Sequence, residues 1–125
     1  MRILLDTQVF IWVIQDNPRL SQAARDTILG ASEVYVSAAS IWEIAIKARL
    51  GKIAADPVRM IQAITESGFS ELSITAQHAA AIEQLPDHHK DPFDRLLVAQ
   101  AMAEPLRLMS SDPQIAKYTD LVIQI

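Results

Sequence analysis

Short runs of apolar, β-prone residues alternate along the chain with longer stretches in which apolar residues recur at helical spacing. The runs that predict strands are residues 2–5, 33–37, 71–74, 106–109 and 121–125. The stretches that predict helices are residues 8–15, 21–30, 39–50, 57–67, 75–85 and 91–104. Strands that alternate with helices favour a parallel sheet covered on both faces. The sequence therefore predicts an α/β fold, with a central parallel sheet of about five strands flanked by helices on both faces.

Residues typical of helix ends lie where the predicted helices begin and end, and none of them indicates a boundary between domains. Ser21 has the character of an N-cap, and Asp56 followed by Pro57 has the pattern of a cap with proline in the first helical turn. Gly30 and Gly51 are expected just beyond the ends of helices. The chain has 125 residues without repeats or low-complexity tracts, so we expect one domain over residues 1–125.

Composition narrows the chemistry that the chain can perform. The 50% hydrophobic and 21% charged residues supply a core and exclude global disorder. There are no cysteines, so thiolate nucleophiles, disulfides and cysteine-bound metals are excluded. A net charge of -4 argues against a broad basic face. Asp6 interrupts the apolar N-terminus and no membrane-length apolar stretch follows, so we expect a soluble, cytoplasmic protein without a membrane partner.

Aspartates stand where the first and fourth predicted strands end. Asp6 follows the first strand, Asp112 follows the fourth, and Asp94 lies in the first turn of the last predicted helix. Ligands of open parallel sheets bind beyond the carboxyl ends of the strands, so these residues are placed for function. Each also has a structural interpretation, since Asp6 and Asp112 can cap helical turns and Asp94 suits a helix N-terminus, with Asp91 as the cap.

The predicted helix over residues 39–50 is apolar on almost all sides and carries one polar stripe. Ser40, Glu43 and Lys47 share that stripe at 100° per residue. The stripe can face solvent, with a Glu43–Lys47 ion pair at i, i+4, or it can line a cleft. Both interpretations stay open at the level of sequence.

Four carboxylates at one end of a sheet predict a cation site. Clustered like charges are unfavourable unless a hard cation neutralises them, and carboxylates with water suit Mg²⁺ or Mn²⁺. A cation held by Asp6, Asp94 and Asp112 would lower the pKa of a bound water and shield charge on a phosphoryl group. Glu43 is a further metal or water ligand, or the general base. This pattern indicates phosphodiester hydrolysis.

Four segments carry a resemblance to a known family: LLDTQVFIW, SAASIWEIAIKARLGK, LPDHHKDPFDRLLVAQA and LMSSDPQIAKY. In this order the chain resembles the PIN-domain ribonucleases, and in particular the VapC-like toxins of bacterial and archaeal type II toxin–antitoxin pairs. The acidic quartet of that family maps onto Asp6, Glu43, Asp94 and Asp112. Ser110 stands where the family commonly has threonine, and it retains the hydroxyl.

The resemblance implies a Mg²⁺- or Mn²⁺-dependent endoribonuclease that cleaves structured RNA, such as transfer or ribosomal RNA, and leaves 5′-phosphate and 3′-hydroxyl ends. It also implies a homodimer and a cognate antitoxin whose C-terminal segment enters the active-site groove. Thr7, beside the first acid, would support the site by contacting a metal-bound water or a substrate phosphate. Asp91 is a reserve metal ligand as well as a helix cap.

Basic and aromatic residues near these motifs have open roles. His89 and Lys90 precede the last predicted helix and would contact RNA or lie in a solvated loop. Arg95 and Lys47 would contact RNA or act as helix-end cations. No histidine is expected to bind metal, because adjacent histidines rarely point the same way. Trp42 is expected to be a core or dimer contact rather than a base-stacking residue.

Two other functions compete with the nuclease. A receiver- or phosphatase-like phosphotransfer domain is disfavoured because Gln8 stands where a second strand-end acid is required. A catalytically silent PIN-fold module for RNA or protein binding is disfavoured because all four acids are present. Divalent-metal binding distinguishes that module from the nuclease.

Overall fold

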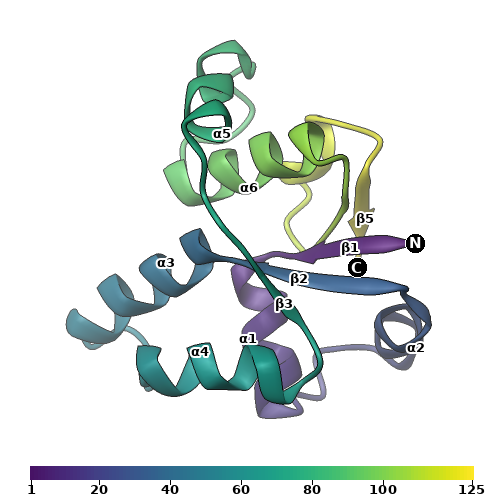
Figure 1. Cartoon of the computed structure of the whole chain (residues 1–125), viewed down its shortest axis with the longest axis vertical. Coiled ribbons are helices and arrows are strands. Elements are labelled where there is room, and N and C mark those ends of the chain that lie inside the picture. Colours follow the sequence, from purple (N-terminus) through teal and green to yellow (C-terminus); the bar gives the residue numbers. More distant parts are fainter.

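Five parallel strands form one sheet in the order β3-β2-β1-β4-β5, so the predicted central sheet is confirmed (Figure 1). The computed structural model describes residues 1–125. Its strands are β1 (Arg2–Leu5), β2 (Glu33–Ser37), β3 (Ser70–Leu72), β4 (Arg107–Ser110) and β5 (Val122–Gln124). Each neighbouring pair is parallel. No helix combines the length and the apolar character needed to span a bilayer.

Six α-helices and two short 3-10 turns connect the strands. They are α1 (Thr7–Gln15), α2 (Gln22–Gly30), α3 (Ala38–Arg49), α4 (Pro57–Glu66), α5 (Ala76–Ala81), η1 (Ile82–Gln84), α6 (Pro92–Ala103) and η2 (Ile115–Lys117). The predicted helix over residues 75–85 is wrong in its second half, where α5 tightens into η1. Leu85 is extended because the following Pro86 disfavours a helical conformation there. Gly30 was expected beyond the helix but is its last residue.

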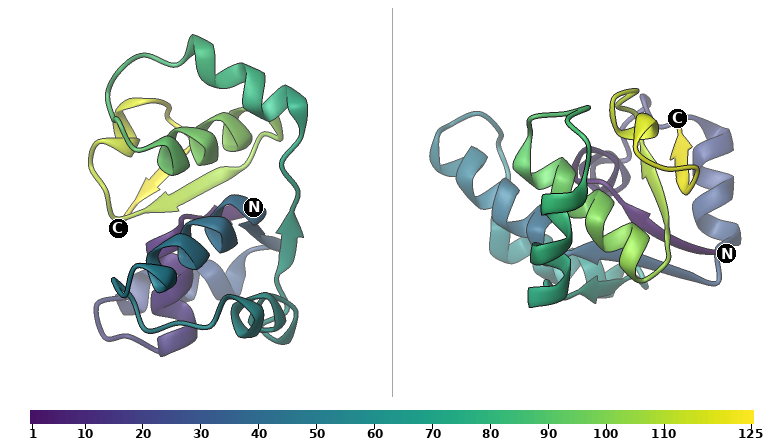
Figure 2. Two further views of the ribbon diagram at one scale, coloured as in Figure 1. Left: turned by 90° about the vertical axis from the view of Figure 1, so that its left-hand side faces the viewer. Right: turned by 90° about the horizontal axis from the view of Figure 1, so that it is seen from above.

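The strands alternate between two apolar layers, as a period of two requires. Ile3 and Leu5 of β1 pack with α1, α2, α3 and α4, whereas Leu4 packs against α6 on the opposite face. In β4, Met109 packs on the same face as Ile3 and Leu5, and Leu108 packs on the same face as Leu4. Figure 2 shows the two helical layers on opposite sides of the sheet. The near-continuous apolar runs of β1 and β4 are therefore explained by burial on both faces.

The direction of the chain across the sheet changes between β1 and β4. The chain moves from β1 through β2 to β3, and then crosses to β4 and β5 on the other side of β1. At this point the Asp6 N–H donates to the Met109 carbonyl at 3.0 Å. In open parallel sheets such a switch point, at the carboxyl ends of the strands, is where ligands bind. Helix α6 runs back from this edge to the start of β4, so its N-terminus lies here too.

Candidate active site

Asp6 stands at the junction of β1 and α1 and caps the helix. Its Oδ1 accepts the Val9 N–H at 2.8 Å, and the residue is only 5% exposed. Burial raises the pKa of Asp6 to about 6, and the charges of Glu43 and Asp112 add to the rise, against hydrogen bonding by Ser110 and the Val9 N–H. The negative charge of Asp6 is therefore disfavoured unless a counter-charge lies beside it.

Glu43 reaches the same place from the middle of α3. Ser40, one turn earlier, is buried and its Oγ accepts the Thr7 hydroxyl at 2.9 Å. The Glu43 side chain is 6% exposed, and its Oε2 accepts from Lys47 Nζ at 2.6 Å. Its Oε1 is buried without a hydrogen-bond partner. The solvent-facing interpretation of this stripe is therefore wrong, although its Glu43–Lys47 ion pair is present.

Asp94 enters from the first turn of α6. Asp91 caps that helix, since its Oδ1 accepts the N–H groups of Phe93 at 2.8 Å and Asp94 at 3.3 Å. Burial raises the pKa of Asp94 to about 7, and repulsion from Asp91, Glu43 and Asp6 adds to the rise. Glu43 is among the charges that raise the pKa values of both Asp6 and Asp94, and Asp6 is among those that raise the pKa of Asp94, so the cap of α1, the middle of α3 and the start of α6 bring carboxylates near one another.

Asp112 lies on the loop after β4, at the rim of this space. The Ser110 Oγ accepts the Asp112 N–H at 3.0 Å, and Asp112 Oδ1 accepts the Gln114 N–H at 2.8 Å. Asp112 Oδ2 lies 2.8 Å from His89 Nε2, and Asp94 Oδ2 lies 3.2 Å from the same nitrogen. The ligand atoms of His89, Asp94 and Asp112 all lie within 4.8 Å of one another. The structure thus brings all four predicted acids to one edge of the sheet.

The predicted RNA-contacting residues fall into two groups. Lys90 is exposed on the loop before α6, and the Lys47 side chain is 44% exposed beside Glu43. The Arg95 side chain is only 15% exposed, and its guanidinium donates to the carbonyls of Pro86, Ile82 and Leu85 at 3.0–3.3 Å. These bonds use the two Nη groups of Arg95 to hold this loop, and a contact of Arg95 with RNA stays a prediction.

Two features of the site escaped sequence reasoning. His89 contacts Asp94 and Asp112, and its main-chain N–H donates to the Tyr118 hydroxyl at 2.8 Å. No spacing signal could reveal this contact, because Tyr118 lies far along the chain. Trp42 is 56% exposed and packs edge-on against Phe93, with the ring centroids 4.9 Å apart. Of the two expected roles of Trp42, a place in the core is therefore wrong, whereas a dimer contact stays a prediction.

The donor set fits a hard divalent cation. Asp6, Glu43 and Asp94 offer carboxylate oxygens, which are the ligands that Mg²⁺ and Mn²⁺ prefer. An unpartnered buried carboxylate oxygen costs free energy, and Glu43 Oε1 is such an atom. A cation held among these carboxylates would offset the repulsion that adds to the raised pKa values of Asp6 and Asp94, and a water beside the cation would donate a hydrogen bond to Glu43 Oε1.

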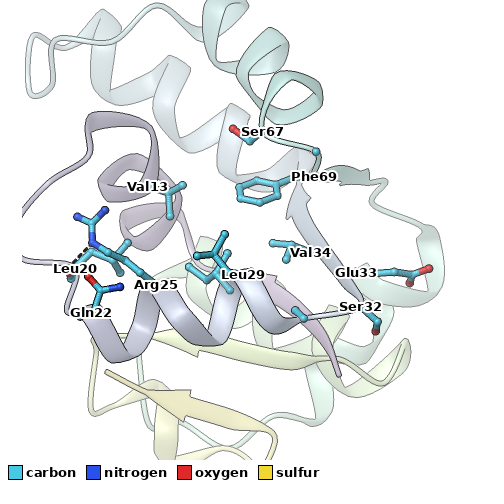
Figure 3. Close-up of a pocket in the computed structure, with 13 residues that line it drawn as sticks. Val13, Leu20, Gln22, Arg25, Leu29, Ser32, Glu33, Val34, Ser67 and Phe69 are labelled. Atoms are coloured by element: carbon cyan, nitrogen blue, oxygen red, sulfur yellow. Dashed lines mark hydrogen bonds between the residues drawn. The ribbon is translucent and has the colours of Figure 1, made fainter.

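A separate pocket of about 470 Å³ lies at the other edge of the sheet, near the start of β2 and the segment before β3 (Figure 3). Its walls are mainly apolar, with Val13, Leu29 and Phe69 around the opening. Arg25 lines it but is already paired with Asp16. None of the four predicted acids lies in this pocket, so we place the chemistry at the carboxylates.

Comparisons with known proteins agree with this fold. The family model described as PIN domain matches residues 3–121. Ribonuclease VapC22 of Mycobacterium tuberculosis is 33% identical over 93% of this chain and 91% of its own length. A chain of a toxin–antitoxin complex from Klebsiella pneumoniae has a TM-score of 0.68 at 17% identity, covering 98% of this chain and 99% of that chain. A chain of VapBC2 from Rickettsia felis, bound to a promoter DNA fragment, has a TM-score of 0.70 at 14% identity, covering 100% and 98%.

Proposed function

The chain belongs to the PIN domain family, and we propose that it is a divalent-metal-dependent endoribonuclease that acts as the toxin of a toxin–antitoxin pair. The observation that carries the proposal is the gathering of Asp6, Glu43, Asp94 and Asp112 at one edge of the sheet, where Glu43 Oε1 is buried without a partner and the ligand atoms of Asp94 and Asp112 lie within 4.8 Å of each other. Two buried carboxylates beside a partly buried third, without a matching set of cations, are costly to a fold, so their retention favours a role in binding a metal and a phosphate.

Asp6 and Asp94 would hold the cation, with Asp112 joining them directly or through water. A bound Mg²⁺ or Mn²⁺ supplies Lewis-acid chemistry, because it lowers the pKa of water and neutralises charge on the phosphoryl oxygens. The bond from the Val9 N–H to the Asp6 carboxylate fixes its orientation, which preorganises this part of the site before substrate arrives.

Glu43 would act as the general base. Its Oε1 has no partner within the protein, so this atom is free to accept a hydrogen bond from the attacking water and then its proton. The water oxygen forms the new bond to phosphorus, and the bond from phosphorus to the 3′-oxygen breaks. The leaving oxygen takes up a proton, and the products carry 5′-phosphate and 3′-hydroxyl ends. Lys47 Nζ donates to Glu43 Oε2 at 2.6 Å and thereby orients that carboxylate.

The partner assignments rest on relatives. Ribonuclease VapC22 supports RNA as the substrate, and the toxin–antitoxin complex from Klebsiella pneumoniae supports a protein antitoxin as the partner. We propose in addition that the chain forms a homodimer and that the antitoxin covers the carboxylate site. The exposed Trp42, which packs on the partly buried Phe93, lies next to Glu43 in sequence and offers an aromatic surface for such a partner.

The test is incubation of the purified, antitoxin-free protein with total cellular RNA in Mg²⁺ or in Mn²⁺, followed by mapping of the cut ends. Reactions in EDTA and reactions with the Asp94→Asn variant serve as controls in which no cleavage is expected. Asp120→Asn, an exposed aspartate outside the site, serves as the matched control. We expect discrete cuts with the wild type and with Asp120→Asn. We expect no cuts in EDTA or with Asp94→Asn. Cuts that persist in EDTA would refute metal dependence, and absence of both cleavage and metal binding would favour a silent binding module.

A further inference from the structure

The His89 ring bridges two carboxylates that come from distant segments of the chain. Its Nε2 lies 2.8 Å from Asp112 Oδ2, on the loop after β4, and 3.2 Å from Asp94 Oδ2, on α6. All three side chains are partly buried, with exposed fractions of 21% for His89, 18% for Asp94 and 34% for Asp112. Both carboxylates are thus held from a single nitrogen atom.

The other ring nitrogen shows which atom carries the hydrogen. The Asp91 main-chain N–H donates to His89 Nδ1 at 3.1 Å. A main-chain N–H can only donate, so Nδ1 presents its lone pair and the ring hydrogen lies on Nε2. Nε2 therefore faces Asp94 and Asp112 as a hydrogen-bond donor. Coordination of a cation by Nε2 would need the lone pair that this tautomer lacks.

The backbone of His89 is fixed as firmly as its ring. The His89 N–H donates to the Tyr118 hydroxyl at 2.8 Å, and Arg95 Nη1 donates to that hydroxyl at 3.2 Å. Arg95 also holds the carbonyls of Pro86 and Leu85 on the same loop. The imidazole is therefore presented by a braced loop rather than by a freely moving one.

We infer that His89 is a positioning residue, which holds the Asp94 and Asp112 carboxylates together through its Nε2–H and does not itself ligate the cation. The inference rests on the proposed function and deepens it. Hydrogen-bond donors that contact metal-ligating carboxylates hold them in orientation. Mutation of such a donor typically lowers metal affinity by about 10- to 100-fold. His89 Nε2 lies at ion-pair distance from Oδ2 of Asp94, on the side where it hydrogen-bonds Asp112 Oδ2, and the Oδ1 oxygen of Asp94 is the one that stays available to a cation.

The test measures metal binding rather than catalysis. Mn²⁺ is titrated into wild type and variants at one fixed pH, free Mn²⁺ is followed by electron paramagnetic resonance, and the bound ion is examined for coupling to a histidine nitrogen. His89→Leu removes the donor, whereas His89→Gln restores an N–H at the reach of Nε2. His88→Leu is the matched control, because the neighbouring His88 is exposed and packs on Tyr118 outside the carboxylate cluster.

We expect His89→Leu to weaken Mn²⁺ binding at least about tenfold, His89→Gln to recover most of that loss, and His88→Leu to bind as the wild type does. The wild-type complex should show no directly coordinated histidine nitrogen. Nitrogen coupling that vanishes in His89→Gln would overturn the inference by making His89 a ligand. Tighter binding by His89→Leu would overturn it too, since the ring would then occupy the place of the cation.

Failure of the inference and failure of the proposed function have different signatures. If the wild type binds Mn²⁺ and His89→Leu binds it equally well, only the positioning role is refuted. If the wild type binds neither Mn²⁺ nor Mg²⁺ at millimolar concentration, the metal-dependent nuclease itself is refuted. Should His89→Leu fold poorly by circular dichroism, the wild-type spectrum and the His89→Gln affinity still decide the question.

Discussion

Asp94→Asn should stabilise the metal-free protein at neutral and alkaline pH. The Asp94 carboxyl has a pKa raised from 3.8 to about 7, mainly by burial and then by repulsion from Asp91, Glu43 and Asp6. The native state therefore holds this proton more tightly than the unfolded chain does. Below about pH 4 the carboxyl is neutral in both states, so it carries no penalty. As pH rises from about 4 to 7, stability is lost, and above about pH 7 the full penalty applies.

The size of that penalty follows from the same shift. At 1.36 kcal/mol per tenfold change in the acid constant, a rise from 3.8 to about 7 corresponds to about 4 kcal/mol. The Asp94 side chain is 18% exposed, so solvent screening reduces the penalty, and we expect about 2 kcal/mol. Asparagine is uncharged at every pH and retains an oxygen that can accept from His89. The variant should therefore gain about this much above pH 7 and almost nothing near pH 4.

The assay is urea unfolding in EDTA at closely spaced pH values between about 4 and 8.5, with wild type, Asp94→Asn and the exposed control Asp120→Asn. The control should follow the wild type, and the Asp94→Asn curve should be flatter. Saturating Mg²⁺ should then abolish the advantage of Asp94→Asn, because only the wild type gains the binding free energy of the cation. Equal pH dependence in wild type and Asp94→Asn, or a destabilised Asp94→Asn, would refute the assignment of Asp94 as a strained carboxylate.

Three further substitutions test the framework around the site. Arg95→Gln removes donors to three loop carbonyls, so amide hydrogen exchange over residues 82–89 should accelerate and stability should fall by about 1–3 kcal/mol. His78→Leu leaves Glu104 and the Thr75 N–H without their buried partner, and thermal unfolding should show a loss of about 2–3 kcal/mol. Trp42→Ala, at a side chain that is 56% exposed, should cost under about 1 kcal/mol; a larger loss would mean that Trp42 is a core residue.

The sheet was predictable because burial on both faces leaves a strong pattern. Residues 2–5 were predicted with the bounds that β1 has, since three of its four residues are fully buried. Asp56 and Ser21 were predicted as caps and accept the expected main-chain N–H groups. The strand predicted at 71–74 is displaced from β3 (Ser70–Leu72), an edge strand with two exposed residues and a weak pattern. The bounds of this edge strand are therefore less well predicted than those of the central strand β1.

Trp42 and His89 mark what the sequence could not predict. Helix α3 is apolar on nearly all sides, so its period does not reveal which apolar positions face solvent, and Trp42 proves to be one of them. His89 meets Asp112 across 23 residues, through a loop whose path depends on Arg95 and Tyr118. Contacts of this kind arise from tertiary structure alone, and no spacing rule encodes them.

In the sequence, a capping role and a catalytic role were alternative interpretations of the aspartates. The two roles are compatible, because a carboxylate has two oxygens and a cap uses only one of them. Asp6 spends Oδ1 on the Val9 N–H, and Asp112 spends Oδ1 on the Gln114 N–H and turns Oδ2 toward His89. Each of these bonds, the helix cap made by Asp6 and the turn closed by Asp112, fixes the plane of its carboxylate and thereby directs the second oxygen. Replacement by alanine would remove both cap and charge, at a cost of about 1 kcal/mol for the cap alone. Replacement by asparagine keeps the cap and removes only the charge, so it isolates the functional role of these residues.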